Sequence, residues 1–417
     1  MALRRRVLGV AARALEQRLN ADTADHAGPT RPCPCGAVAR SAGRRPKRFE
    51  SVLGPLTLER AYYHCAACDS GVSPRDQHLG LVGTSLSPAV TRMIGLVGAL
   101  GSFAEGSDLV RELAGVPVTT KHVERTAKAL GHEIAADERR VVESPAPATV
   151  PPTLYLGMDG SGIPMRASDL ADRPGKQPDG SAKTREGKLC TVWSAEARDA
   201  QGLPVRDEGS VTYSAALESA ASRDTDAAPS DFAQRVLREA QRRGLDQASR
   251  CVVLGDGAPW IWNLADEHFP DALQIVDRFH VKHHLSEVAK AIYGPTSDTG
   301  RQWAQQRHAD LDAGHLDALL HALASHARAC DEARKCVEYI ERNRARMRYP
   351  EFHAAGLCTS TGVVEAGCKV VIGARLKRAG MHWTVGGANA ILALRCTQLS
   401  GRFEDFWERR SQAGGSP

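Results

Sequence analysis

From residue 154 onward, short apolar runs alternate with amphipathic stretches, and this alternation restricts the possible folds more than any other feature. Three predicted strands are followed by a helix, a strand, a helix and another strand, before a long helical block begins. The predicted strands cover residues 154–158, 188–197, 209–216, 251–254 and 272–276, and the first of the helices covers 231–243. Strands that alternate with helices in this way predict an α/β domain.

A proline-rich stretch at residues 143–152 predicts a linker in front of this domain. The predicted catalytic domain then covers residues 153–410, and residues 411–417 are predicted to be a disordered tail. Ahead of the linker we expect an N-terminal helix and linker over 1–30, a β-rich segment over 31–86 and a helical region over 87–142. The helical region could form a helix-turn-helix-like DNA-binding unit, although any small helical bundle would give the same pattern.

Composition and charge narrow the class of protein. The 417 residues are 42% hydrophobic and 25% charged, which is typical of globular proteins and excludes a disordered or fibrous chain. No apolar run reaches the length of a membrane-spanning helix, and the first 20 residues are better explained as a cytosolic helix than as a signal peptide. Residues 1–60 hold 12 Lys and Arg against 5 Asp and Glu, which indicates either contact with a polyanion or a solvated basic face.

Four cysteines stand in two close pairs within the β-rich segment: Cys33 and Cys35, then Cys65 and Cys68. Four thiolates in two such pairs predict one tetrahedral Zn²⁺ in a zinc-ribbon-like segment; the alternative is a set of reduced structural cysteines. The remaining cysteines are spread over the chain and do not form the dense pattern of a secreted disulfide scaffold.

Three acidic residues stand out by their positions. Asp159 follows the first predicted strand, Asp256 follows the fourth, and Glu365 lies in a late helix. A sheet of this kind brings the carboxyl ends of the first and fourth strands together, and three carboxylates there could hold two Mg²⁺ ions for attack at phosphorus. Taken singly, each Asp could be an ordinary Asp-Gly turn residue, and Glu365 could pair with Lys369 one helical turn later.

The sequence around these residues resembles the DDE transposases of bacterial insertion sequences, in the ISKra branch of the Mutator-like group. The similar segments are MDGSGIP at 158–164, LGDGAPWIW at 254–262, DRFH at 277–280 and STGVVEA at 360–366. The resemblance covers most of residues 30–400. It implies a ribonuclease H-like mixed sheet, Asp159, Asp256 and Glu365 as a triad that binds Mg²⁺ or Mn²⁺, and a helical insertion at about 281–357.

The first cysteine pair departs from this family, whose members usually have two residues between the cysteines instead of one. The departure puts one zinc ligand in doubt, with His64 and His78 as possible substitutes.

Further site residues are suggested by the same motifs. Asp277 and His280 match the family's Cys/Asp-x-x-His signature, in which the histidine could bind a phosphate or orient a catalytic carboxylate; it could also simply cap a helix. Aromatic and basic side chains near the triad are candidates for contact with DNA, with core packing and solvated helix faces as the alternatives. They are Trp260, Trp262, Arg375, Lys377, Arg378 and Trp383.

The resemblance implies a transposase that binds terminal inverted repeats, cleaves DNA at the ends of its element and joins those ends to target DNA. Two ends must be held together, so a homodimer or larger assembly is expected, in the bacterial cytoplasm and associated with the nucleoid. Two other readings remain: a ribonuclease H-like nuclease without strand transfer, and a decayed element that only binds DNA. A zinc-ribbon regulator would leave the C-terminal residues unexplained.

Overall fold

The computed structural model describes residues 2–140, 150–171, 174–175, 177–218 and 231–414. They form two compact units: Met1–Asp137 together with Gly401–Pro417, and Glu138–Ser400. Most of the predicted linker, residues 143–149, lies outside the described residues. Among the described helices, none has both the length and the apolar character needed to cross a membrane.

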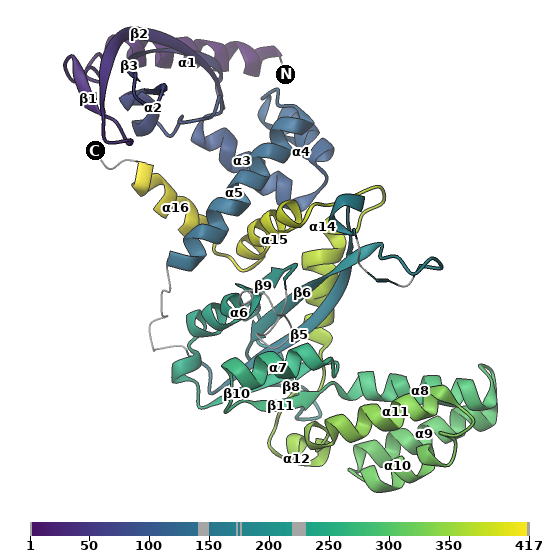
Figure 1. The fold of residues 1–417 in the computed structure, drawn as a ribbon. Coiled ribbons are helices and arrows are strands. Elements are labelled where there is room, and N and C mark those ends of the chain that lie inside the picture. Colours follow the sequence, from purple (N-terminus) through teal and green to yellow (C-terminus); the bar gives the residue numbers. More distant parts are fainter. Residues whose placement is uncertain (1, 141–149, 172–173, 176, 219–230, 415–417) are drawn as a thin grey trace. The chain divides into compact units, whose positions relative to one another are not determined.

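Four antiparallel strands in the order β1-β2-β3-β4 form the sheet of the N-terminal unit (Figure 1). β2 (Val38–Ser51) and β3 (Gly54–Cys65) make a long hairpin, and short strands β1 (Thr30–Pro32) and β4 (Ser70–Val72) extend it at either side. Gly54 has φ +119° at the hairpin turn, a conformation that L side chains rarely adopt. An apolar cluster packs on the hairpin with α1 (Ala2–Ala21) and the residues around α2 (Pro74–His78), and its buried members are Ala12, Phe49, Leu56, Leu58 and Leu81.

Helices make up the rest of this unit. Ser102 and Glu105 form a capping box at the start of α4 (Phe103–Leu109), in which the side chain of each accepts a hydrogen bond from the backbone N–H of the other. The helices are α3 (Pro88–Leu100), α4 (Phe103–Leu109), the π-helical segment η1 (Val110–Ala114), α5 (Thr120–Arg140) and α16 (Phe403–Gly414).

The position of α16 corrects two predictions. Residues 401–410 group with the N-terminal unit and not with the predicted catalytic domain, and residues 411–414 are helical where a disordered tail was predicted. Residues 415–417 lie outside the described residues.

A five-stranded mixed sheet is the centre of the second unit, with the strand order β11-β10-β5-β6-β9. In chain order this is three antiparallel strands, followed by two strands that are parallel to the first and lie on its other side. The strands are β5 (Thr153–Pro164), β6 (Thr184–Trp193), β9 (Thr212–Ala216), β10 (Arg250–Gly255) and β11 (Leu273–Val276). The predicted mixed α/β architecture is therefore present, with strand ends shifted by a few residues.

Helices surround this sheet, namely α6 (Asp231–Arg242), α7 (Pro259–His268), α13 (Gly362–Gly367), the π-helical segment η7 (Cys368–Gly373), α14 (Ala374–Leu376) and α15 (Val385–Leu399). Of these, α6 and α7 share its apolar core, α13 contacts β5 and β6, and α15 contacts β9. A small hairpin of β7 (Ala197–Arg198) and β8 (Pro204–Val205), and the single turns η3 (Ala167–Asp169) and η5 (Leu245–Gln247), connect the larger elements.

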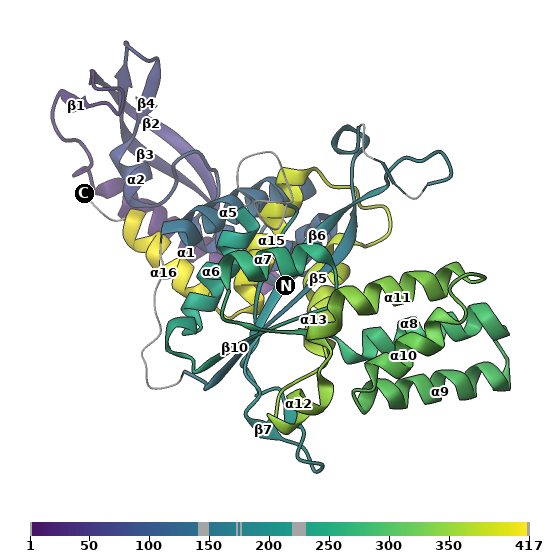
Figure 2. The ribbon, with the colours of Figure 1, turned by 60° about the horizontal axis from the view of Figure 1, so that its bottom comes forward.

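A block of helices lies between β11 and α13, at the position predicted for the insertion (Figures 1 and 2). Its inner faces carry leucines at helical spacing, including the fully buried Leu285, Leu311, Leu319 and Leu323. The block consists of α8 (Arg278–Tyr293), α9 (Asp298–Asp312), α10 (Leu316–Ala324), α11 (Asp331–Asn343), the turn η6 (Arg344–Arg346) and α12 (Tyr349–Ala354).

Candidate functional site

Asp159 and Asp256 occupy equivalent positions on two neighbouring parallel strands. β5 and β10 pair in a register that places Met158 opposite Gly255, and each aspartate is the next residue of its chain. The N–H of Gly160 donates to Asp159 Oδ1 at 2.7 Å, and the N–H of Ala258 donates to Asp256 Oδ1 at 2.9 Å. β5 continues beyond Asp159 to Pro164, so this aspartate lies within its strand and not at the strand's end as predicted.

Glu365 comes to the same part of the sheet on α13, and two glycines allow the approach. A Cβ on Gly157 would lie 2.7 Å from the Trp193 ring and 3.2 Å from Val364 Cβ, and a Cβ on Gly367 would lie 2.9 Å from Leu189 Cδ2. A side chain at either glycine would collide with these neighbouring side chains, so the two glycines allow α13 to pack closely on β5 and β6. The Glu365 side chain is exposed beside them.

The three carboxylates interact electrostatically. Burial raises the pKa of Asp159 above its usual value, and the negative charges of Asp256 and Glu365 raise it further, against the hydrogen bond from Gly160. The donor set is three hard oxygen ligands with mutual repulsion, which a divalent cation would relieve. Within the described residues, however, their ligand atoms do not all lie within 4.8 Å of one another, as the atoms of the cysteine cluster do.

Asp277 is a buried helix cap. Its Oδ1 accepts hydrogen bonds from the N–H of Phe279 at 2.6 Å and of His280 at 3.1 Å, at the start of α8. Its Oδ2 accepts the N–H of Thr361 at 2.7 Å and also the Thr361 hydroxyl. Asp277 therefore joins the start of α8 to the start of α13, and its polar atoms are used in that junction.

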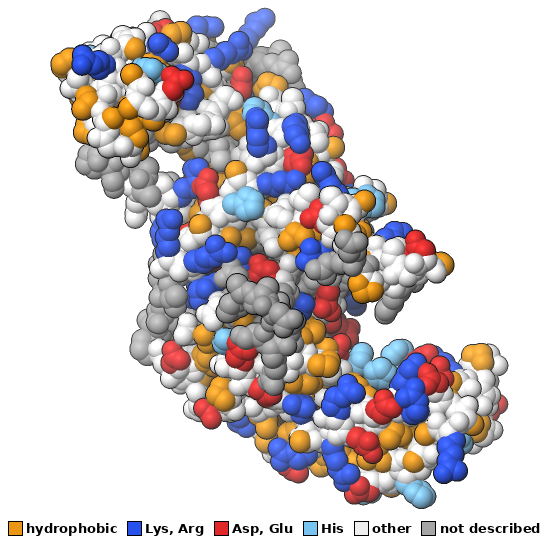
Figure 3. All heavy atoms as spheres, viewed as in Figure 1, with side chains coloured by type: hydrophobic (Ala, Val, Ile, Leu, Met, Phe, Trp, Pro, Cys, Tyr) orange, Lys and Arg blue, Asp and Glu red, His pale blue; other side chains and the backbone are white. Residues whose placement is uncertain are grey.

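His280 and His284 lie one turn apart on α8, with their Nε2 atoms 3.1 Å from each other. Burial lowers the pKa of His284, and the charges of His280 and His283 lower it further, while the charge of Asp256 opposes the change. Figure 3 shows histidine side chains and acidic side chains gathered over the start of α8. The histidine pair is therefore within electrostatic reach of the second aspartate.

Tyr339 of α11 is a supporting residue that no sequence motif indicated. Its hydroxyl donates to the backbone carbonyl of Asp256 at 2.6 Å, and burial raises its pKa, which keeps the hydroxyl protonated. The ring lies against Gly257, where a Cβ would be 2.5 Å from it and where φ is +99°. The insertion thus supports the turn that carries Asp256, a contact between segments that are 83 residues apart.

The structure separates the six predicted DNA contacts into two groups. Trp262, Arg375 and Trp383 are buried, with exposed fractions of 4%, 0% and 5%, so DNA contact by these three side chains is corrected to core packing. Arg346 covers the Trp262 ring at 4.6 Å, and Trp383 Nε1 donates to the Leu376 carbonyl at 3.0 Å.

The other three predicted contacts reach the surface. Trp260 is half-buried, with the Lys188 ammonium 5.4 Å above its ring. Lys377 and Arg378 are exposed, and Lys377 Nζ donates to Ser161 Oγ at 3.0 Å, two residues beyond Asp159. A cationic side chain therefore lies close to the aspartate-bearing strand.

In the N-terminal unit, the four predicted cysteine ligands converge. Their sulfur atoms all lie within 4.8 Å of one another, with Cys33 to Cys68 at 3.6 Å and Cys35 to Cys65 at 3.7 Å. Sulfurs bound tetrahedrally at about 2.3 Å from one zinc ion would be about 3.8 Å apart, so this cluster could hold zinc. The backbone N–H of Cys35 and the hydroxyl of Ser70 lower the pKa of Cys33 to about 6, whereas the neighbouring thiols raise the pKa of Cys35 to about 12. Zinc binds cysteine as the thiolate, so a bound ion would have to displace the proton of Cys35.

Although only one residue separates Cys33 from Cys35, the sulfur of Cys35 still belongs to the cluster. His64, one of the two predicted substitutes, instead lies 3.0 Å from Asp69 Oδ1 through its Nε2. Neither His64 nor His78 belongs to the group of converging ligand atoms.

Comparison with known proteins gives a partial match. Residues 231–410 match the model of the uncharacterised protein family UPF0236, a segment that includes Asp256, Asp277, His280 and Glu365. No curated protein matches the chain. Among solved structures, the Drosophila P element transposase strand transfer complex is similar at 10% identity and a TM-score of 0.27, over 81% of this chain and 84% of that one.

Proposed function

We propose that the chain is a DNA transposase of an insertion sequence, of the ISKra branch, with Asp159, Asp256 and Glu365 as its catalytic triad. The observation that carries the proposal is the pairing of Asp159 and Asp256 at equivalent positions of adjacent parallel strands, with Glu365 in electrostatic reach. The strand order, three antiparallel strands followed by two parallel ones on the other side, supports a ribonuclease H-like catalytic domain. The sequence motifs around the triad support the choice of family.

The three carboxylates would hold Mg²⁺ or Mn²⁺, because they are hard oxygen donors. Burial raises the pKa of Asp159, and the charges of Asp256 and Glu365 add to the rise, which a bound cation would oppose. When bound, the ions supply an activated attacking oxygen and neutralise charge on the phosphate. The chain's own residues keep the carboxylates in place: Tyr339 supports the Asp256 turn and Asp277 supports the start of α13. Lys377, exposed beside Ser161, is placed to bind a backbone phosphate.

The N-terminal unit would bind the terminal inverted repeats. Its β2 strand carries the exposed side chains of Arg40, Arg45 and Arg48. A bound zinc ion would hold together the start of β2 and the end of β3, at the open end of the hairpin. Basic side chains on one strand supply the sequence-independent part of DNA affinity. Since two ends must be held together, we further propose a dimer or larger assembly on DNA.

The test is cleavage and strand transfer with purified protein, Mg²⁺ or Mn²⁺, and DNA that carries the ends of the element from the flanking genome. The proposal expects metal-dependent cleavage and joined products, both abolished by Asp256→Ala. Lys335→Ala is a suitable control, because Lys335 lies in an exposed ion pair of α11 with Asp331. Cleavage without joined products would instead support the nuclease reading, and binding without cleavage would support a decayed element. Cleavage that survives Asp256→Ala would overturn the assignment of the triad.

A further inference from the structure

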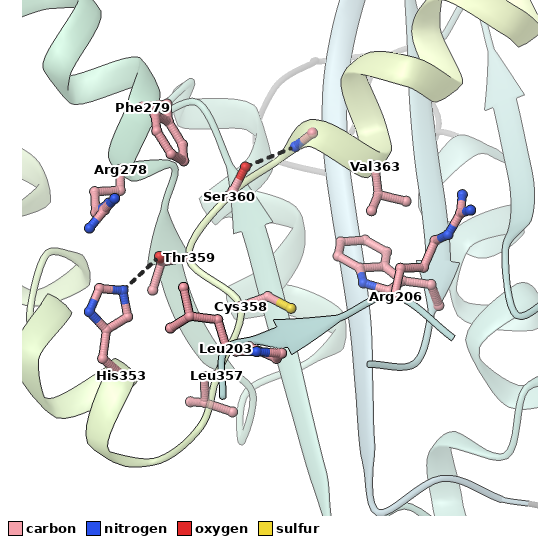
Figure 4. A pocket seen from close by; sticks show the side chains of 13 residues that line it. Leu203, Arg206, Arg278, Phe279, His353, Leu357, Cys358, Thr359, Ser360 and Val363 are labelled. Carbon is pink, nitrogen blue, oxygen red and sulfur yellow. Dashed lines mark hydrogen bonds between the residues drawn. The ribbon is translucent and has the colours of Figure 1, made fainter. Parts of the chain in front are cut away.

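A cavity of about 350 Å³ lies between the start of α8, the β7–β8 hairpin and the segment that leads to α13. Figure 4 shows Arg278 and Phe279 on one side of the segment from Leu357 to Ser360, and Arg206 and Val363 on the other. Phe279 directly precedes His280, and Val363 stands two residues before Glu365. The cavity is therefore built from the same segments that position the proposed catalytic residues, but it contains none of the triad.

The walls of this cavity combine an aromatic face with positive charge. The Phe279 side chain is 56% exposed although it is large and apolar, and the guanidinium of Arg278 lies 5.1 Å from its ring centre. Arg206 is exposed on the opposite wall and has no ion-pair partner within the described part of the chain. The exposed ring therefore has one guanidinium beside it, that of Arg278, which also pairs with Asp312 at 3.3 Å, and a second guanidinium on the opposite wall (Figure 4). An aromatic surface for stacking with cationic side chains around it is typical of sites that bind a nucleobase and its phosphate.

Two buried hydrogen-bond donors at the cavity also lack acceptors among the described residues. They are Nε1 of Trp193, whose side chain is fully buried, and Nε of Arg278. Buried donors are almost always satisfied in folded proteins, and those that are not indicate a missing partner. Both donor atoms are shielded from solvent in this structure, so they do not form part of the cavity surface that a base would contact.

We propose that this cavity receives a single unpaired nucleobase from DNA bound at the active site, with the ring of Phe279 as its stacking surface. The inference rests on the proposed function, because it assumes that DNA occupies the neighbouring triad. The cavity is at the small end of the range for ligand pockets, about 300–1,000 Å³, which suits one base and not a dinucleotide. Extruded bases are held in snug pockets of this kind by stacking and by hydrogen bonds to their edges.

The test measures binding of three short fluorescein-labelled duplexes in the absence of divalent metal. One duplex is fully paired, one has a single bulged thymine, and one has an abasic nucleotide at the bulge. We expect the full-length protein to prefer the thymine bulge over the abasic bulge by about tenfold, as for one base stacked on an aromatic ring. Phe279→Ala should abolish this preference, and Arg206→Ala should weaken binding of both bulged duplexes.

Val205→Ala is the matched control, since Val205 is exposed on β8 next to Arg206 but does not line the cavity. It should leave the preference unchanged. Equal affinity of the wild-type protein for the two bulged duplexes would overturn the base pocket while leaving the proposed transposase function intact. If Phe279→Ala lowered the affinity for all three duplexes by the same factor, the base pocket would also be overturned, because the ring would then be a general DNA contact. Failure to bind any duplex would contradict both proposals.

Discussion

Asp277 and Thr361 are joined by two hydrogen bonds across 84 positions of the sequence. Both the N–H and the hydroxyl of Thr361 donate to the same carboxylate oxygen, while the other oxygen caps α8. One buried side chain therefore fixes the starts of two helices, the one with His280 and the one with Glu365. This arrangement supports a positioning role for Asp277.

Asp277→Asn should lower the free energy of unfolding by about 1–3 kcal/mol, because an amide nitrogen cannot accept the hydrogen bonds of Thr361. Urea denaturation measures the loss. Thr361→Ser is the matched control and should stay close to wild type, since it keeps both donors. If Asp277→Asn were as stable as the wild type but did not cleave DNA, Asp277 would instead have a role in the chemistry.

Gly157→Ala should destabilise the second unit by about 1–3 kcal/mol, because the new methyl group would meet the buried Trp193 ring at 2.7 Å. Gly386→Ala is the matched control. Gly386 lies in the first turn of α15, and no atom lies within 4 Å of a Cβ added there, so stability should stay the same or increase slightly. Chemical denaturation of the two variants compares them directly. Equal stabilities would contradict the close packing of the Trp193 ring over Gly157.

Asp159→Asn should stabilise the metal-free protein at neutral pH. The raised pKa of Asp159 means that its contribution to stability is complete below the ordinary aspartate pKa, about 3.9, and is lost as the pH rises through the folded-state value. The asparagine has no such loss, so the difference from wild type should vanish in acid. Thermal unfolding at several pH values measures it, and a wild type more stable than the variant at neutral pH would contradict the sign.

Mg²⁺ should make the wild-type protein more stable than Asp159→Asn, the reverse of the order expected without metal. An ion at about 100 times its dissociation constant stabilises the folded state by about 2.7 kcal/mol, and Asp159→Asn removes a proposed ligand. Thermal unfolding with and without Mg²⁺ should therefore show stabilisation of the wild type alone. An equal response of both proteins would place the ion elsewhere.

Lys377→Ala should weaken DNA binding and Arg375→Ala should lower stability, although the two residues are only two positions apart. Lys377 is exposed, so its loss should not change stability. It should reduce the slope of the logarithm of DNA affinity against the logarithm of salt concentration by about one. Arg375 is fully buried over the Trp383 ring, so its loss should cost about 2–5 kcal/mol of stability. Fluorescence anisotropy across a salt series and thermal unfolding separate the two effects; a stable Arg375→Ala with weakened DNA binding would contradict the burial.

Purified protein should contain one zinc ion per chain, measured by mass spectrometry of the metal, and Cys35→Ser should lower that content and the stability of the N-terminal unit. Cys330→Ser is the control, because Cys330 lies in the helical insertion and outside the cluster. Full zinc content in Cys35→Ser would show that the Cys-x-Cys pair supplies only one ligand.

The sequence was informative where function and local pattern coincide. The apolar runs before Asp159 and Asp256 predicted two strands, and pairing of these strands brings the aspartates together. The four cysteines converge as their spacing indicated, since one pair precedes β2 and the other stands at the end of β3, and the hairpin brings these two points together. In both cases the pattern that allowed the prediction, an apolar run followed by an aspartate or two closely spaced cysteines, lies within a few consecutive residues.

Long-range contacts and burial carried no such signal. Arg375 and Trp383 follow Glu365 in a basic stretch and were predicted to bind DNA, yet tertiary packing buries both of them. Tyr339 stands in an ordinary amphipathic helix, and only the folded chain shows its hydrogen bond to Asp256. One carboxylate oxygen of Asp277 likewise gains its partner, Thr361, from a segment 84 residues away.

The hydrogen bond from Tyr339 to the Asp256 carbonyl has a consequence for how such a chain can change over time. The insertion is not an independent appendage, because α11 supplies part of the support for a proposed catalytic residue. Gly257 must stay free of a side chain for as long as the tyrosine ring lies against it. Substitutions in α11 and in the turn after β10 are therefore expected to occur together, and a graft of the insertion from another protein would have to bring its own partner for that turn.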